Sequence, residues 1–549
     1  MKYYSIPFLL LIMAPIWGQN TLQSTIDTLL KEAVPDVATP GLTVGVVQDG
    51  QLVYHQSRGC MHLGYDLPFN DSTVFGLASV TKQFTAACIG VLAQQGRLSV
   101  HDDVRRYLPE LAFYGDTIRI RHLLNHTSGI RNHNVLLDLQ GFDYAHRGYT
   151  NAMIEALMFK QKGINNPPGA TMRYSNTNYV LLALIVERVS GEPLHAFART
   201  ELFEPLGMTH SCYKSQLGQL IKNKAQTYPK KGDQYQNFPS LTLCVGAGGM
   251  VSAIEDLAKW SQIFLDTTAK LRYLKPFLTQ LDTLTDGSPM KHARGIFVAP
   301  YKGHLTLNHS GRDRGMRSQF ICVPQLQLAI VVYANTNALD AVGLSYRILD
   351  AFLPPAPAIS TARIQGDNAY ADVPLATFQG VYQELNSDLK MTFSVQQDTL
   401  MVLSSFGQRA IPLRRTSSTT FQRMDNPAVS YNFRPSGNAD LEIDFGGAVF
   451  YFETIELDPR PNKDLEDYVG DFYSEELDVT YSLRLVDGQL LLSYPNNVDL
   501  VLKEGATDTF GANRRTKYAF RRNSEGRVVG FEVASEGTVK GILFEKVAL

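Results

Sequence analysis

The sequence predicts an α+β domain followed by two all-β domains of the antiparallel barrel type. Up to about Phe352, segments with helical periodicity alternate with strand-like segments. A proline-rich stretch follows, and the rest of the chain consists of short β-type runs that repeat after roughly 90 residues. The length of 549 residues agrees with several domains, because single hydrophobic cores seldom grow beyond about 300 residues.

The composition is that of a globular chain without a polyanionic partner. Hydrophobic residues make up 44% and charged residues 19%, which allows a large core. A formal net charge of -2 gives no reason to expect nucleic acid binding. The five cysteines lack C-x-x-C spacing, which argues against a zinc site and a disulfide scaffold, and we expect small buried side chains at Cys60, Cys88, Cys212, Cys244 and Cys322. No motif calls for a cofactor or a metal.

The first 18 residues have the pattern of a signal peptide. Lys2 precedes an apolar run from Ile6 to Trp17 that is too short to span a bilayer, and small and polar residues follow. We expect cleavage near Gly18 and Gln19, with a buried N-terminal helix as the alternative. No cysteine lies near the cut, so no lipid anchor is expected there. Because no later stretch reaches about 18 apolar residues, we expect a secreted or periplasmic, soluble protein without a membrane span.

Elements of the first domain, residues 19–352, follow from local patterns. Two β-rich runs within residues 42–59 meet at Asp49-Gly50, a strong hairpin signal. Residues 82–98 have apolar spacing of the 3.6 period and reach a stop signal at Gly96, which predicts a helix. A second long helix is expected from Tyr179 onward, apolar enough to be buried on most faces.

The C-terminal part reads as a linker and two copies of one unit. Prolines within residues 353–370 predict the linker. Three motifs recur in order at nearly one offset, which predicts β-barrel repeats at 371–457 and 463–549. The matched pairs begin at Phe378 and Tyr468, at Tyr431 and Tyr518, and at Phe452 and Phe544.

The first candidate catalytic pair is Ser79 and Lys82. A helix is about to begin there, so the two side chains would share one face, one turn apart. A serine hydroxyl needs a base within hydrogen-bond reach to act as a nucleophile. The pattern alone is weak, since a capping serine would look the same and Ser211-Cys212-Tyr213-Lys214 also matches.

The second candidate element is Tyr174-Ser175-Asn176, in a polar segment before the second long helix. A phenol becomes a base only where a nearby ammonium such as that of Lys82 stabilises its phenolate. Two further Y-x-N triplets, at Tyr333 and Tyr494, show that this pattern is also weak alone.

The third candidate element is His309-Ser310-Gly311, at the end of one strand-like run and before another. Small residues on a strand edge allow a substrate backbone to lie alongside, and a backbone N–H there can face an oxyanion. His62-Leu63-Gly64 and His146-Arg147-Gly148 match the same pattern. If His309 takes part in binding or proton transfer, activity should titrate between about pH 5 and 8.

These three elements, in this order and at these separations, resemble the penicillin-recognising serine hydrolases: β-lactamases with a tyrosine base, D,D-carboxypeptidases, D-aminopeptidases and related esterases. The sequence around the three motifs is more specific than the motifs themselves. The resemblance covers roughly residues 25–350. It includes the segments IRHLLNHTSGI, PPGATMRYSNTNYVLLALIVERVSG, LFEPLGMTHS and GAGGMVSAIEDLAKWSQIFL. It implies a β-lactamase-like fold, an antiparallel sheet flanked by helices.

The resemblance also implies roles for these residues. Ser79 would attack a carbonyl, Tyr174 and Lys82 would move its proton, and Asn176 would hold Lys82 and the substrate. The backbone N–H groups of Ser79 and Arg312 would form the oxyanion hole, and water would hydrolyse the acyl-enzyme.

One departure affects the expected substrate. Most β-lactamases and carboxypeptidases of this kind begin the third motif with lysine, whereas this chain has His309, largely neutral at pH 7. The D-aminopeptidase and esterase relatives, among which histidine occurs there, are therefore the better match. We expect hydrolysis of an amide or ester in a small molecule or peptide. The alternatives are β-lactamase or D,D-carboxypeptidase activity, or a non-catalytic ligand-binding sensor.

Three features outside these motifs also need an interpretation. His122 and His126 stand four residues apart on an expected helix but lack the H-E-x-x-H pattern, so packing and capping are favoured over zinc. The glycines from Gly246 to Gly249 predict a tight turn near the active site. The two β-units either act as spacers or, as the D-aminopeptidase resemblance suggests, lay a loop across the mouth of the site.

Overall fold

The first domain is built on a six-stranded sheet. The computed structural model describes residues 16–238, 241–353, 373–385, 387–405, 407, 409–424, 429–433, 439–445, 449–455, 464–505, 507–512 and 515–547. The strands of this sheet are antiparallel to their neighbours, in the order β10-β11-β12-β13-β1-β2. Their bounds are β10 (Phe297–Tyr301), β11 (His304–Asp313), β12 (Met316–Val323), β13 (Leu328–Ala334), β1 (Leu42–Gln48) and β2 (Gln51–Arg58).

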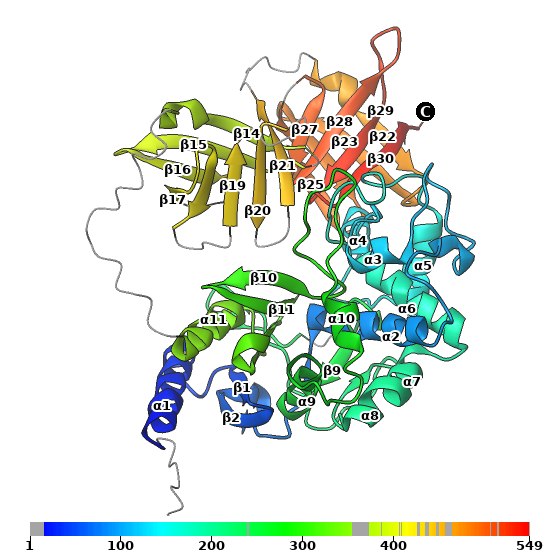
Figure 1. Cartoon of the computed structure of the whole chain (residues 1–549). Coiled ribbons are helices and arrows are strands. Elements are labelled where there is room, and N and C mark those ends of the chain that lie inside the picture. Colours follow the sequence, from blue (N-terminus) through cyan, green and yellow to red (C-terminus); the bar gives the residue numbers. More distant parts are fainter. Residues whose placement is uncertain are drawn as a thin grey trace, which may run out of the picture.

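Helices cover both faces of this sheet (Figure 1). Alternate residues of β13 divide between two cores: Ile330 and Val332 pack with α1 (Ile16–Ala33) and α11 (Ala341–Phe352), whereas Val331 and Tyr333 belong to the larger core on the other face. This division follows from the two-residue period of a strand. The helices of the larger core and its surroundings are α2 (Lys82–Gln94), α3 (Ile120–Leu124), α4 (His133–Leu139), α5 (Asn151–Phe159), α6 (Asn176–Ser190), α7 (Leu194–Ala198), α8 (Glu204–Leu206), α9 (Ile254–Leu265) and α10 (Leu274–Thr279).

A small three-stranded sheet lies beside the start of α2. Its order is β5-β9-β6, and it comprises β5 (Phe75–Gly76), β9 (Met250–Ser252) and β6 (Cys212–Tyr213). After β5 the chain passes through a 3₁₀ turn, η2 (Ala78–Thr81), and enters α2 without a break. Two strand pairs complete the domain: β3 (Cys60–His62) with β4 (Leu67–Pro68), and β7 (Lys230–Lys231) with β8 (Gln234–Tyr235).

The C-terminal region contains two up-and-down β-structures. The first is a closed eight-stranded barrel of β14 (Gly380–Glu384), β15 (Lys390–Gln396), β16 (Thr399–Ser404), β17 (Ile411–Arg415), β18 (Thr420–Arg423), β19 (Val429–Phe433), β20 (Leu441–Phe445) and β21 (Val449–Ile455). The second, called here the second barrel, is a nine-stranded sheet that is nearly closed, in the order β25-β24-β23-β22-β30-β29-β28-β27-β26. Its strands are β22 (Gly470–Ser474), β23 (Val479–Val486), β24 (Gln489–Tyr494), β25 (Asn497–Val501), β26 (Lys503–Glu504), β27 (Thr509–Ala512), β28 (Thr516–Arg522), β29 (Val528–Ser535) and β30 (Val539–Lys546).

The repeated sequence motifs occupy equivalent places in the two barrels. Phe378 and Tyr468 each end a short 3₁₀ turn and are buried. Gly380 and Gly470 each begin the first strand, with φ of 141° and 140°, a conformation that favours glycine. The two cores differ in one respect: that of the first barrel is separate, whereas that of the second is continuous with the larger core of the first domain.

The α+β class with two barrel-like structures is thus confirmed, as are the hairpin and both long helices. The helix α2 begins at Lys82, as expected, but Ser79 lies in the preceding 3₁₀ turn rather than in the first turn of the helix. The second long helix, α6, begins at Asn176, three residues before the expected start at Tyr179. Residues 1–15, most of the expected signal peptide, and all but the first residue of the 353–370 linker lie outside the described residues, and the expected cut falls within α1. Within the described part of the chain, no helix is long and apolar enough to cross a bilayer, and all five cysteines are free thiols.

Candidate active site

Ser79 stands at a sharply bent point of the backbone. Ala78 has a φ of 47°, which is unusual for a residue with a side chain. The preceding Leu77 donates its N–H to the carbonyl of Met250 at 3.0 Å, so the small sheet holds the approach to the turn. The chain then bends into η2 and α2, which leaves the Ser79 side chain at the wall of a cavity.

Lys82 lies behind Ser79 and is fully buried. Its Nζ is 3.1 Å from Ser79 Oγ, 2.8 Å from Asn176 Oδ1 and 2.9 Å from the carbonyl oxygen of Ala247. No carboxylate is among these partners. Burial lowers the pKa of Lys82 well below its ordinary value, because the charged form loses its hydration.

The neutral form of Lys82 fits these three contacts. A neutral amine has two N–H donors and one lone pair. The carbonyl oxygens of Asn176 and Ala247 accept the two donors. The lone pair is then left for the Ser79 hydroxyl, which is the arrangement that a general base requires.

Asn176 links Lys82 to a neighbouring loop. Its Oδ1 accepts from Lys82, and its Nδ2 donates to Asn134 Oδ1 at 2.7 Å. Asn134 Nδ2 donates in turn to the Tyr149 hydroxyl at 3.1 Å. The amide of Asn176 is therefore fixed in orientation by both ends, with its oxygen toward Lys82.

Tyr174 completes this group from the same segment. The Lys82 Nζ is 4.9 Å from the centre of its ring. Burial raises the pKa of the Tyr174 phenol, and a hydrogen bond with Ser79 acts in the opposite direction. With Lys82 neutral, the phenol remains protonated near pH 7 and can donate a proton rather than take one.

His309 lies beside Tyr174, with ring centres 6.2 Å apart. It is only 2% exposed, and its Nδ1 lies 2.7 Å from the Ser310 carbonyl. Burial, with a further contribution from Lys82, lowers the pKa of His309 to about 3. An imidazole with this pKa stays neutral between pH 5 and 8, so His309 is not the source of a titration of activity in that range.

Two further histidines extend this buried cluster. The ring of His292 is 6.0 Å from that of His309, and the ring of His126 is 4.3 Å from that of Tyr174. Burial lowers the pKa of both well below the ordinary value. The surroundings of Tyr174 are thus uncharged imidazoles, which favours the neutral form of the whole group.

Gly311 brings β11 against the turn that carries Ser79. A Cβ at this position would lie 2.3 Å from the Leu77 carbonyl oxygen and 2.0 Å from Ser318 Oγ. Only glycine allows this approach. β10 pairs with β11 only as far as Asn308, so the stretch after it has a strand edge that β10 does not cover, as the sequence predicted.

A cavity of about 890 Å³ opens in front of Ser79. Of the predicted site residues, Ser79, Asn176 and Arg312 line it, whereas Lys82, Tyr174 and His309 are not among the lining residues. Ser310 points to solvent, as does Arg312, on the opposite face of β11 from His309. Sequence reasoning missed the Ala247 carbonyl, Asn134, and two lysines of the cavity wall, Lys214 and Lys224.

The competing motifs have structural explanations. Ser211 is buried and hydrogen-bonded to Ser252 Oγ at 2.8 Å and Asp256 Oδ2 at 2.9 Å, and it precedes the strand β6 rather than a helix. Tyr333 stacks on Phe75 within the core. His146 is exposed beside an aspartate.

The remaining sequence features also have a place. His122 Nδ1 accepts from the Arg119 N–H at 3.2 Å and so caps α3, but His126 lies past the end of that helix, which stops at Leu124. Gly246 and Gly249 have positive φ in a turn whose Ala247 faces Lys82. Across the residues that the structure describes, no cluster of histidine, cysteine or acidic side chains is arranged to hold a metal ion.

A family model described as Beta-lactamase matches residues 24–352, more than half of the chain. The chain belongs to the Beta-lactamase family. Members of this family are serine hydrolases. The match covers Ser79, Lys82, Tyr174, Asn176 and His309. It ends at residue 352, before the first strand of the C-terminal barrels.

Two curated relatives each align with more than half of this chain. Protein flp of Staphylococcus aureus (strain MRSA252) is 29% identical over 329 residues, 58% of this chain and 64% of that protein. Penicillin-binding protein 4* of Bacillus subtilis (strain 168) is 30% identical over 305 residues, 51% of this chain and 64% of that protein. The chain thus spans somewhat less than two thirds of the length of each relative.

Solved structures share the fold at lower identity. An octameric penicillin-binding protein homologue from Pyrococcus abyssi aligns with a TM-score of 0.54 and 21% identity over 79% of this chain and 99% of that chain. A D-amino acid amidase from Ochrobactrum anthropi SV3, complexed with L-phenylalanine amide, aligns with a TM-score of 0.51 and 22% identity over 60% of this chain and 98% of that chain.

Proposed function

We propose that this protein is an exported serine hydrolase that cleaves an amide or ester through an acyl-enzyme on Ser79. The observation that carries the proposal is the contact of 3.1 Å between Ser79 Oγ and the Nζ of Lys82, whose pKa is lowered by burial. A base at hydrogen-bond distance, with its other hydrogens already engaged, is what turns a serine hydroxyl into a nucleophile.

The remaining groups have roles in the same reaction. Lys82 takes the hydroxyl proton as the Ser79 oxygen attacks the carbonyl, and the Tyr174 phenol, hydrogen-bonded to Ser79, passes a proton to the leaving group. The backbone N–H groups of Ser79 and Arg312 stabilise the oxyanion, with Gly311 allowing β11 to approach. Water then attacks the acyl-enzyme, and the same two groups carry the proton transfers in the reverse direction.

The substrate class rests on the third motif and on related proteins. His309 is uncharged, so it offers no fixed cation of the kind that lysine supplies in most β-lactamases and carboxypeptidases. The D-amino acid amidase and EstCE1, a hydrolase with promiscuous acyltransferase activity, share the fold. We therefore favour a D-aminopeptidase-like peptidase or an esterase.

Labelling with a fluorophosphonate tests the proposal. The probe should add one adduct to the wild type, mapped to the peptide that contains Ser79, and none to Ser79→Ala. Ser211→Ala is the matched control and should label at the wild-type rate, although loss of its buried hydrogen bonds should lower stability by about 1–2 kcal/mol. A panel containing a penicillin, a D-amino acid amide and a simple ester then ranks the substrates. An unlabelled wild type would contradict the proposal.

Export is tested separately by N-terminal sequencing of the mature protein. A start near Gln19 would agree with cleavage after the apolar segment. A chain that retains Met1 would contradict export by this route.

A further inference from the structure

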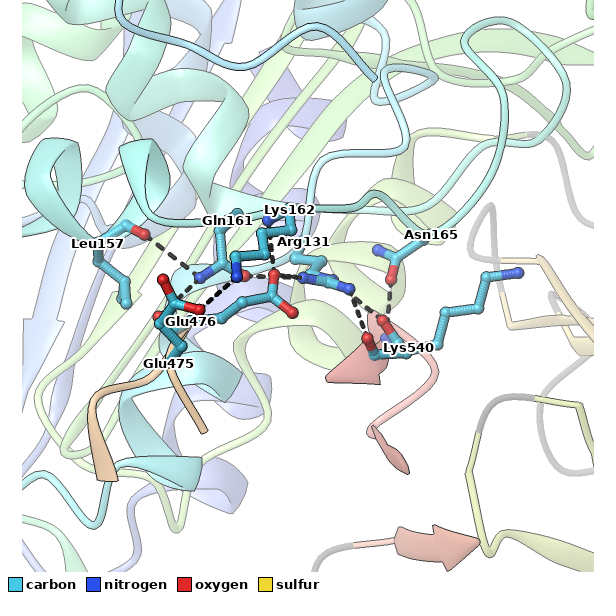
Figure 2. Close-up of polar contacts among 9 residues, drawn as sticks. Arg131, Leu157, Gln161, Lys162, Asn165, Glu475, Glu476 and Lys540 are labelled. Carbon is cyan, nitrogen blue, oxygen red and sulfur yellow. Dashed lines mark hydrogen bonds and ion pairs between the residues drawn. The ribbon is translucent and has the colours of Figure 1, made fainter. Parts of the chain in front are cut away.

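The second barrel forms hydrogen bonds with the segment of residues 131–141, which in turn contacts Asn176. Arg131 reaches between the two domains and is almost fully buried, and its Nη1 lies 2.6 Å from Glu476 Oε2 (Figure 2). The same guanidinium donates to the backbone carbonyls of Lys540 and Gly541, each at 3.0 Å. Glu476 also accepts from the Lys162 N–H at 2.6 Å. A buried carboxylate with this many partners is costly to replace.

The contact continues along residues 131–141 of the first domain. The Asn132 N–H donates to the Thr538 carbonyl at 3.2 Å. The Tyr481 hydroxyl donates to the Leu139 carbonyl at 2.6 Å. Asn496 Nδ2 donates to the Gly141 carbonyl at 2.7 Å. The second barrel therefore holds both ends of this segment, which contains α4 and lies below the barrel in Figure 1.

The held segment is also the support of Asn176. Asn132 Oδ1 accepts from the Asn176 N–H at 3.3 Å, and Asn134 Oδ1 accepts from Asn176 Nδ2 at 2.7 Å. The Arg131 carbonyl accepts from Thr177 Oγ1 at 2.7 Å. Because Asn176 Oδ1 is a partner of Lys82, hydrogen bonds linked by the short backbone stretch 131–134 connect Glu476 with the base.

We propose that the second barrel is a positioning element of the active site, which acts through Glu476 and Arg131 on Asn176 and so on Lys82. The catalytic effect rests on the function proposed above. Among the residues that the structure describes, all those that line the cavity belong to the first domain. None of the described barrel residues therefore lies across its mouth, and the barrel acts from behind the site.

Two neighbouring glutamates provide the test in the full-length protein. Glu476→Gln removes the buried charge, whereas Glu475→Gln removes a charge that is 74% exposed and pairs with Lys162. We expect Glu476→Gln to lower kcat for an ester roughly 10- to 100-fold with little change in KM, because Glu476 lies outside the cavity. Amide hydrogen exchange in residues 131–141 should become faster. Glu475→Gln should leave kcat and exchange within about twofold of the wild type.

If Glu476→Gln does not fold, Asn496→Ala loosens the other end of the segment and should change exchange and kcat in the same direction. Wild-type kcat and wild-type exchange in a folded Glu476→Gln or Asn496→Ala protein would overturn the proposal. If the wild type is not labelled at Ser79, the proposed function fails, but the exchange comparison still decides whether the barrel holds the segment.

A second, independent observation concerns charge in the cavity. Lys214 and Lys224 both line its wall, partly buried. In the described part of the chain, neither side-chain nitrogen has an ion-pair or hydrogen-bond partner. Burial and the charge of Lys224 lower the pKa of Lys214 to about 8, against an opposing effect of Asp313, and burial lowers the pKa of Lys224. Four cationic side chains line this cavity against two acidic ones, Asp138 and Asp313.

We infer that Lys214 and Lys224 bind a carboxylate on the non-reacting part of the substrate. Two unpaired ammonium groups in one partly buried wall destabilise each other, and an anion between them offsets that cost. The assignment rests on the proposed function, and it gives the carboxylate-binding role to a different wall from the one where most β-lactamases place a lysine.

Paired esters test this inference. Mono-p-nitrophenyl glutarate carries a free carboxylate, and p-nitrophenyl methyl glutarate does not. The kcat/KM of the charged ester divided by that of the methyl ester should fall about tenfold in each of Lys214→Gln and Lys224→Gln. The ratio should stay at its wild-type value in Lys222→Gln, because Lys222 is exposed and does not line the cavity. Glutarate binding to Ser79→Ala, measured by calorimetry, should weaken in the same two backgrounds. An unchanged ratio, or no saturable glutarate binding to Ser79→Ala, would overturn the inference.

Discussion

The side-chain oxygen of Asn176 lies 2.8 Å from the Lys82 nitrogen, and this contact joins the start of α6 to the start of α2. It occupies one of the two hydrogens of a neutral lysine, with the Ala247 carbonyl taking the other. The lone pair that remains faces Ser79. The chemistry proposed here depends on this division of contacts.

Loss of the Asn176 oxygen should therefore slow acylation. Asn176→Leu keeps the volume but removes both the acceptor for Lys82 and the donor to Asn134, and kcat/KM should fall about 100-fold. Asn134→Ala removes only the support and should cost about tenfold. Steady-state kinetics with one ester measures both. Equal effects of the two variants would argue against direct action of Asn176 on Lys82.

The pH dependence of activity should follow Lys82. Burial lowers the pKa of Lys82, so its base form is available at pH values where a free lysine is charged. As the pH falls through that lowered pKa, Lys82 gains a proton and kcat/KM should fall. Because the pKa of His309 is about 3, His309→Asn should leave the midpoint of this acid limb unchanged between pH 5 and 8. A shift of the limb in that variant would contradict the assignment.

The stability of the fold should fall in mild acid. Burial lowers the pKa values of six imidazoles, those of His55, His122, His126, His133, His292 and His309. The pKa of His122 falls to about 4 and those of His133 and His309 to about 3, whereas the unfolded chain binds a proton to each near pH 6.5. The unfolded state therefore binds more protons below pH 6.5, and the free energy of unfolding falls as the pH falls toward 3. Each imidazole contributes up to about 1.4 kcal/mol per pH unit. Urea unfolding at pH 7.5 and 5 measures the difference, and equal values would contradict it.

A methyl group at Gly311 should damage the site. Its Cβ would overlap the Leu77 carbonyl oxygen, so β11 must move away from the turn that carries Ser79. For Gly311→Ala we expect a loss of roughly 100-fold in kcat/KM, typical of a lost oxyanion donor. Gly303→Ala is the control: with a φ of 85° and open space around it, it strains a surface turn and should cost about 1 kcal/mol of stability but no activity. Normal kinetics in Gly311→Ala would show that the approach of β11 is not needed.

Local patterns in the sequence predicted those parts of the site that lie close together in the chain. Ser79 and Lys82 are three residues apart at a helix start, and their contact follows from helix geometry. The Ala247 carbonyl is 165 positions from Lys82, and Glu476 is 345 positions from Arg131. No periodicity or motif indicates such pairs, because they depend on how the domains pack. The pKa of His309 was missed for the same reason, since its burial comes from distant elements.

Trapping of the acyl-enzyme tests the central claim most directly. The wild type is mixed with a p-nitrophenyl ester, quenched in acid after the burst of p-nitrophenol, and mapped by mass spectrometry. The account predicts one acyl group on the peptide that contains Ser79, and neither a burst nor an acyl group in Ser79→Ala. Turnover of the ester with no acyl group on Ser79, or with the acyl group on another residue, would contradict it.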